Sequence, residues 1–155
     1  MTLNRRSFAI ALLAGCFLAP GLAAAQNYPP AVTQLVAAAK KQVKTIDIAQ
    51  FKAAYDKNEL GLIVDVRDPD EYADGHIPGA VNVSRGLLEF RIWPHVGYPD
   101  KTDMSRRITL YCRTGGRCAL AAKTLQELGF TNVVAGDIKI EEWAKAGYPM
   151  VKPKK

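Results

Sequence analysis

An apolar segment rich in β-branched residues, Ile108-Thr109-Leu110-Tyr111, leads directly into Cys112-Arg113-Thr114-Gly115-Gly116-Arg117. The segment has the composition of a strand buried in a sheet, and a helical pattern follows over residues 119–128 and ends at Gly129. The cysteine therefore lies between a strand and a helix. Open parallel sheets bind their ligands at this edge, outside the carboxyl ends of the strands.

The residues that follow the cysteine favour its ionised form. Gly115 and Gly116 permit positive φ angles, so that successive backbone N–H groups can converge above the sulfur. The following helix contributes the positive end of its dipole, and Arg113 and Arg117 add positive charge. Cysteines in such surroundings have pKa values of about 3.5 to 7.5, against about 8.5 for a free cysteine. The sequence predicts that Cys112 is a nucleophile in an anion-binding loop.

Strand and helix patterns alternate along the rest of the chain. Apolar runs predict strands over residues 44–47, 61–66, 80–83, 108–112 and 132–135. Helical spacing predicts helices over residues 30–39, 48–55, 119–128 and 141–146, of which the first packs on the outside of the fold. This alternation indicates an α/β architecture with a mainly parallel central sheet.

Residues 1–25 have the organisation of a signal peptide. Arg5 and Arg6 precede an apolar run, and Ala23-Ala24-Ala25 supplies the small residues that a signal peptidase needs. Arg5-Arg6-Ser7-Phe8 also resembles a twin-arginine signal. We therefore expect export to the periplasm of a bacterium, where free thiols meet oxidants.

A lipoprotein is the alternative outcome of export. Leu13-Ala14-Gly15-Cys16 matches a lipobox, in which Cys16 would be lipidated and would tether the chain to a membrane. Against this interpretation, Phe17 follows directly and the apolar run continues to Ala25.

Length and charge restrict the remaining classes. A chain of 155 residues has room for one domain beyond the signal peptide, and 48% hydrophobic content is ordinary for a packed globule. The net charge of +6 is not gathered into an arginine-rich stripe with aromatic residues, so nucleic-acid binding is not expected. Three cysteines and two histidines cannot build a zinc finger. We expect a monomer that acts on small molecules.

Three groups of residues, in this order, resemble the signatures of the rhodanese (sulfurtransferase) family. They are Asp65-Val66-Arg67-Asp68 with Glu71-Tyr72 and Gly75-His76-Ile77-Pro78-Gly79-Ala80-Val81-Asn82; then Cys112-x-x-Gly115-x-Arg117; then Ala135-Gly136 with Trp143 and Ala146-Gly147-Tyr148-Pro149. The resemblance implies a five-stranded, mainly parallel sheet flanked by helices on both faces. It places a rhodanese domain at residues 44–152, after an amino-terminal lead and helix at residues 26–43.

The resemblance also implies a reaction. A sulfane donor such as thiosulfate would lose its outer sulfur to the Cys112 thiolate, and the resulting persulfide would pass that sulfur to a thiol or to cyanide. No metal or organic cofactor is needed. The implied substrate-binding residues are Arg113, Thr114, Gly115, Gly116 and Arg117.

Two other functions compete with this one. A rhodanese-like module in the cell envelope could carry sulfur or bind a redox partner without turnover. A phosphatase or arsenate reductase could use a related loop, but those phosphatases have five residues between cysteine and arginine, whereas four separate Cys112 from Arg117. The shorter loop is sized for a single sulfur atom.

Cys118 departs from the commoner family pattern, which has serine after the arginine. It could be a small residue packed under the loop, a thiol that resolves an oxidised or persulfidated Cys112, or one half of a permanent disulfide. A permanent disulfide would abolish sulfur transfer.

Several polar residues are interpreted as supporting. Asp65 and Arg67 are predicted to form a buried ionic network near the site, which Glu71 could join. His76 is interpreted as a turn residue rather than a general base. The long connection from Arg85 to Arg106 either covers the site or is a surface excursion.

Overall fold

The structure of the protein is a computed structural model, of which residues 28–152 are described. The predicted signal peptide at residues 1–25, with its twin-arginine sequence and Cys16, lies outside the described residues. Within residues 28–152, no helix is long and apolar enough to cross a membrane.

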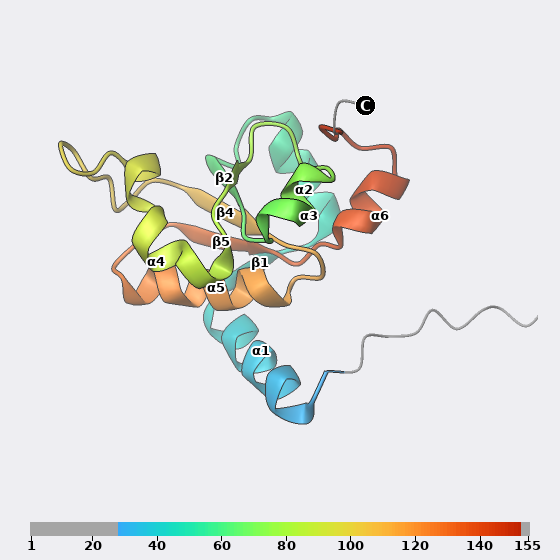
Figure 1. Cartoon of the computed structure of the whole chain (residues 1–155), viewed down its shortest axis with the longest axis horizontal. Helices are drawn as coiled ribbons and strands as arrows, with labels where there is room; N and C mark the ends of the chain where they lie inside the picture. Colours follow the sequence, from blue (N-terminus) through green and yellow to red (C-terminus); the bar gives the residue numbers. More distant parts are fainter. Residues whose placement is uncertain (1–27, 153–155) are drawn as a thin grey trace, which may run out of the picture.

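A single sheet of five parallel strands organises the domain, in the spatial order β1-β5-β4-β2-β3 (Figure 1). This confirms the predicted architecture. The strands are β1 (Lys44–Ile46), β2 (Leu62–Asp65), β3 (Val81–Asn82), β4 (Ile108–Tyr111) and β5 (Val133–Gly136). Each residue of β2, β4 and β5 is buried, as continuous apolar runs predict for strands covered on both faces.

Helices cover both faces of the sheet (Figure 1). One face packs against α1 (Pro30–Gln42), α4 (Leu88–Arg91) and α5 (Gly116–Glu127). The other packs against α2 (Ile48–Asp56), α3 (Pro69–Ala73) and α6 (Ile140–Lys145). The cores on the two faces are separate, and Trp143 and Phe51 are fully buried in the second.

Most predicted elements end within a residue of the observed ones, but the helix predicted over residues 30–39 runs on to Gln42, and two others differ in ways that affect the sheet edge and the loop. The run at residues 80–83 was predicted as a buried strand, but β3 has two half-buried residues, because an edge strand has a partner on one side only. The helix predicted from residue 119 begins at Gly116, so Gly116 and Arg117 belong to the first turn of α5. Gly115 alone of the two glycines has a positive φ, of 83°.

The connection between β3 and β4 packs along the face of the sheet that α5 covers. It contains two short 3₁₀ helices, η1 (Arg85–Leu87) and η2 (Trp93–Val96), on either side of α4. Leu88, Ile92 and Val96 are buried in the core on the α5 face. Farther along, Met104 O accepts a hydrogen bond from Thr131 N, which precedes β5. This part of the connection therefore lies at the amino ends of the strands, whereas at its start Arg85 N donates to the carbonyl oxygen of Val66, just after the carboxyl end of β2.

Candidate active site

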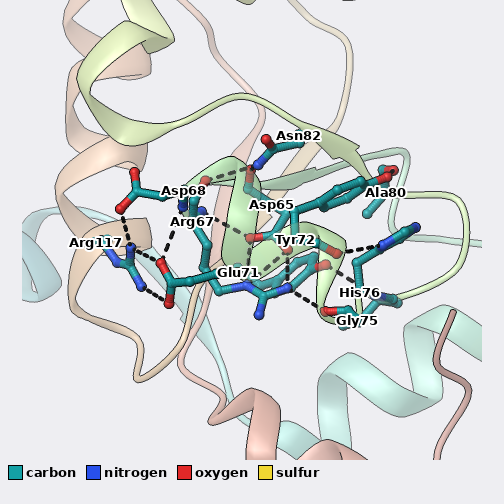
Figure 2. Close-up of polar contacts among 12 residues, drawn as sticks. Asp65, Arg67, Asp68, Glu71, Tyr72, Gly75, His76, Ala80, Asn82 and Arg117 are labelled. Carbon is teal, nitrogen blue, oxygen red and sulfur yellow. Dashed lines mark hydrogen bonds and ion pairs between the residues drawn. The ribbon is translucent and has the colours of Figure 1, made fainter. Parts of the chain in front are cut away.

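A buried ion pair closes the carboxyl end of β2 (Figure 2). Arg67 Nη2 lies 2.6 Å from Asp65 Oδ2, and the Arg67 backbone N–H also donates to the Asp65 carboxylate. Arg67 Nη2 donates as well to the carbonyl oxygen of Gly75, at 2.8 Å. The predicted network is confirmed, and it ties the strand end to the turn at residues 75–79.

His76 lies in this turn as a structural residue. Its ring stacks on Tyr72 with centroids 3.7 Å apart, and its Nδ1 is 3.0 Å from the Tyr72 carbonyl oxygen (Figure 2). Its backbone pairs with Val151. The next residue, Ile77, donates its N–H to the Tyr111 hydroxyl, at 3.1 Å. The turn is thereby fixed to β4, whose last residue, Tyr111, directly precedes Cys112.

The loop after β4 curls around the Cys112 sulfur. Hydrogen bonding from the backbone N–H groups of Thr114, Gly115 and Cys118 is among the causes that lower the pKa of this thiol. Gly115 makes the curl possible: its φ of 83° is strained for any residue with a side chain, and a Cβ there would lie 2.2 Å from Asp137 Oδ1. Gly116 has helical backbone angles and is therefore not a second positive-φ position.

These donors stabilise a thiolate. The Cys118 thiol makes the largest contribution, the backbone donors add to it, and together they outweigh burial and hold the pKa of Cys112 at about 6. The side chain is buried, with 1% of its surface exposed. With a pKa of about 6, the Cys112 sulfur is mainly a thiolate at neutral pH.

Cys118 lies beneath the loop as a free thiol, as does Cys112. Its sulfur is fully buried and 3.2 Å from each of two carbonyl oxygens, those of Gly115 and Gly136. The hydrogen-bonding interaction with Cys112, followed by burial and the charge of the Cys112 thiolate, holds the pKa of Cys118 well above its usual value. A permanent disulfide is therefore absent, and the thiol is held as a neutral donor, the protonation state least suited to attack on a persulfide.

Both loop arginines are paired with carboxylates. Arg117 binds Glu71 through two hydrogen bonds, at 2.6 and 2.8 Å, and lies 3.6 Å from Asp68 (Figure 2). Glu71 therefore joins Arg117 rather than the Asp65 and Arg67 pair. Arg113 pairs with Glu141 at 2.7 Å, and both of these side chains are more than half exposed. Arg117 keeps a third of its side-chain surface exposed and stays within electrostatic reach of Cys112.

The hydrogen bond from Cys118 predicts a specific pH response. Alkylation of Cys112 by iodoacetamide should rise with pH around a midpoint near 6, because only the thiolate reacts. Cys118→Ala should raise that midpoint by about one pH unit, since one donor to the anion is lost. Cys118→Ser should restore most of the shift. Equal midpoints in the three proteins would contradict this account of the pKa.

The amino-terminal helix lies closer to the loop than the sequence indicated. Val36 of α1 packs over Gly116, where a Cβ would be 3.5 Å from Val36 Cγ2. Tyr28, Val32 and Val36 form one wall of a cavity whose other wall includes Thr114 and Arg117. Apolar side chains at every third or fourth position of this helix indicate that one of its faces is buried. They do not show which element that face packs against.

Comparison with known proteins places this geometry in a family. The Rhodanese-like domain model matches residues 47–146. A sulfurtransferase of Allochromatium vinosum is 31% identical over 111 residues, which are 72% of this chain and 97% of that protein. The thiosulfate sulfurtransferase PspE of Escherichia coli is 36% identical over 77 residues, 49% of this chain and 69% of that protein.

Two other matches differ from these, one in its described function and the other in its length. A solved structure from Rhodopseudomonas palustris, described as a protein of unknown function and a possible tyrosine phosphatase, has a TM-score of 0.67 and 32% identity. The match covers 82% of this chain and 98% of that one. A match to a Bacillus subtilis protein covers 65% of this chain but only 51% of the relative, which is a longer protein.

Proposed function

We propose that this chain, which belongs to the rhodanese family, transfers sulfane sulfur through a Cys112 persulfide. Its sulfurtransferase relatives support sulfur transfer as the general chemistry. The observation that carries the proposal is the position of the buried Cys112 directly after β4, in a loop that Gly115 turns into the amino end of α5; the lowering of its pKa to about 6 supports it. We propose thiosulfate as a donor and a thiol or cyanide as the acceptor.

The first half-reaction consists of donor binding and sulfur attack. Thiosulfate would approach the loop as a dianion, guided by the exposed parts of Arg113 and Arg117. Since both arginines are paired with glutamates, the loop N–H groups supply most of the local stabilisation. The Cys112 thiolate attacks the outer sulfur, the bond between the two donor sulfurs breaks, and sulfite leaves with the electron pair.

The second half-reaction returns the free enzyme. The terminal persulfide sulfur would carry the negative charge, and the N–H groups of Thr114 and Gly115, which help to lower the pKa of Cys112, would stabilise it in the same way. A thiolate or cyanide attacks that sulfur and releases the Cys112 thiolate. Asp65 and Arg67 have a positioning role. Arg67 binds the turn at residues 75–79, and the Ile77 N–H of that turn donates to the hydroxyl of Tyr111, the last residue of β4.

Loop geometry favours sulfur transfer over phosphate chemistry. Gly115 caps a helix that starts one residue later, so Arg117 falls in the first helical turn and binds Glu71. An arginine held by two hydrogen bonds to a carboxylate has fewer donors left for a tetrahedral phosphate. The ring from Cys112 to Arg117 is also one residue shorter than in the phosphatases.

Steady-state kinetics test the proposal. With thiosulfate and cyanide, thiocyanate formation should follow a ping-pong scheme, with parallel lines in double-reciprocal plots, because sulfite leaves before the acceptor binds. p-Nitrophenyl phosphate should not be hydrolysed. Stoichiometric loading of sulfur without turnover would instead favour a carrier, and phosphate release would favour a phosphatase.

A further inference from the structure

The amino-terminal helix α1 is attached to the domain through few residues. It has 13 residues, of which only Ala39 is buried, and it lies against α5 (Figure 1). It precedes residues 47–146, which the family model matches. A helix of this length is only marginally stable in isolation, so its contacts with the rest of the domain decide whether it forms.

Three contacts attach α1 close to the Cys112 loop. Val36 packs over Gly116, the first residue of α5. Ala39 belongs to the core on the α5 face of the sheet. Lys40 Nζ donates to Asp137 Oδ1 at 2.6 Å, and this contact joins α1 to the segment that follows β5.

The segment after β5 supports the loop from behind. The carbonyl oxygen of Gly136 accepts a hydrogen bond from the Cys118 thiol, at 3.2 Å. The Ile140 N–H donates to the carbonyl oxygen of Arg113, also at 3.2 Å. The Asp137 N–H donates to the last residue of β1, at 2.8 Å. The segment is therefore bonded to the sheet on one side and to both ends of the loop on the other.

The Asp137 side chain fills the space beside the middle of the loop. A Cβ on Gly115 would lie 2.2 Å from Asp137 Oδ1, so this oxygen occupies the place where a side chain would begin. It is the same oxygen that accepts the hydrogen bond from Lys40. Because 43% of the Asp137 side chain is exposed, rotation into water is open to it. The Lys40 ammonium favours the rotamer in which the carboxylate stays against Gly115.

We propose that Lys40 is a positioning residue for sulfur transfer, which holds the Asp137 carboxylate against Gly115 and thereby fixes the turn of the loop after Cys112. The inference rests on the proposed function, since that function gives the loop its role. It assigns a part in the site to a helix that lies outside the residues matched by the family model.

The charges around the thiols set the direction of the expected effect. Asp137 and Lys40 have opposite effects on the pKa of Cys118, the carboxylate raising it and the ammonium lowering it. Without Lys40, the Asp137 charge is less compensated and disfavours a second anion close by. A looser turn acts in the same direction, because the loop N–H groups help to lower the pKa of Cys112. Charged side chains that act on the two thiols or on Asp137 are Arg117, Lys40 and Lys139.

The variant Lys40→Met tests the proposal. The pH midpoint for alkylation of Cys112 by iodoacetamide should rise by about half a pH unit, which is the scale of one partly exposed ion pair. Well below the midpoint, the thiolate fraction then falls about threefold. The kcat/KM for thiosulfate at about pH 5 should fall by at least the same factor. Lys40→Arg should restore both values, because the guanidinium keeps the pair with Asp137.

Lys52→Met is the matched control. Lys52 pairs with Asp56 on α2 at 2.6 Å, and its side chain is 24% exposed, against 31% for Lys40. Its alkylation midpoint and its kcat/KM should equal those of the wild type. The loss of stability in urea should be similar in Lys40→Met and Lys52→Met, since each breaks one partly exposed pair.

The outcomes separate this inference from the function on which it rests. A midpoint that Lys40→Met leaves unchanged, that Lys52→Met shifts equally, or that Lys40→Arg does not restore overturns the role of Lys40, while thiosulfate turnover still supports sulfur transfer. A Lys40→Met variant that loses only stability overturns it as well. Absence of thiosulfate turnover in the wild type would overturn the function instead, and the alkylation midpoints would still show whether Lys40 acts on the loop.

Discussion

Replacing Cys112 by serine is expected to lower kcat for thiocyanate formation by about 10⁴-fold or more, since loss of a catalytic nucleophile costs up to about 10⁶-fold. A serine hydroxyl does not ionise near neutral pH, so the anion that the loop N–H groups stabilise would not form. Donor binding should persist, because those N–H groups and Arg117 remain. The measurement is steady-state turnover with thiosulfate and cyanide.

The matched control for this substitution is Cys118→Ser. It exchanges the same atoms at a second buried cysteine, in the first turn of α5, and keeps a hydrogen-bond donor near the Cys112 sulfur. It should retain at least about a tenth of the wild-type kcat. Equal losses in the two variants would mean that packing, rather than the Cys112 sulfur itself, accounts for the effect.

Removal of Arg67 is expected to have the largest effect on stability. Arg67→Met leaves the fully buried Asp65 carboxylate without its partner and removes the hydrogen bond to the Gly75 carbonyl oxygen. Breaking a buried pair in this way costs about 3 to 5 kcal/mol. Urea denaturation should show that decrease in the free energy of unfolding, with the denaturant slope unchanged.

Two further variants make the stability result specific. Arg113→Met breaks a pair whose side chains are both more than half exposed, so it should cost about 1 kcal/mol or less. In the Arg67→Met background, Asp65→Asn removes the unpaired charge and should recover part of the lost stability. If Arg67→Met destabilised the protein no more than Arg113→Met, the buried pair would not have the role assigned to it.

The sheet could be predicted because its strands are covered on both faces. Buried parallel strands have continuous apolar runs, and those of β2 and β4 are bounded by polar residues that mark their ends. The strand predicted over residues 80–83 is longer than the edge strand β3, because the run does not show that only two of its residues pair with β2. The start of α5 was placed late, because glycine at a first helical position weakens the helical pattern.

The candidate site was predictable where its residues are adjacent in sequence and less so elsewhere. Asp65 and Arg67 are two positions apart, and their pairing was predicted correctly. Glu71 and Arg117 are 46 positions apart, and their bidentate pair depends on how α3 and α5 pack. The contact of Val36 with Gly116 likewise depends on the path of α1, which no local pattern records.

Intact-mass analysis of the purified protein after exposure to thiosulfate tests the central claim, that Cys112 carries the transferred sulfur. The wild type and Cys118→Ser should each gain the mass of one sulfur atom, lose it on addition of cyanide, and carry it on the peptide that contains Cys112; Cys112→Ser should gain none. A wild-type protein whose mass does not change, or a sulfur atom located on Cys118, would contradict the account.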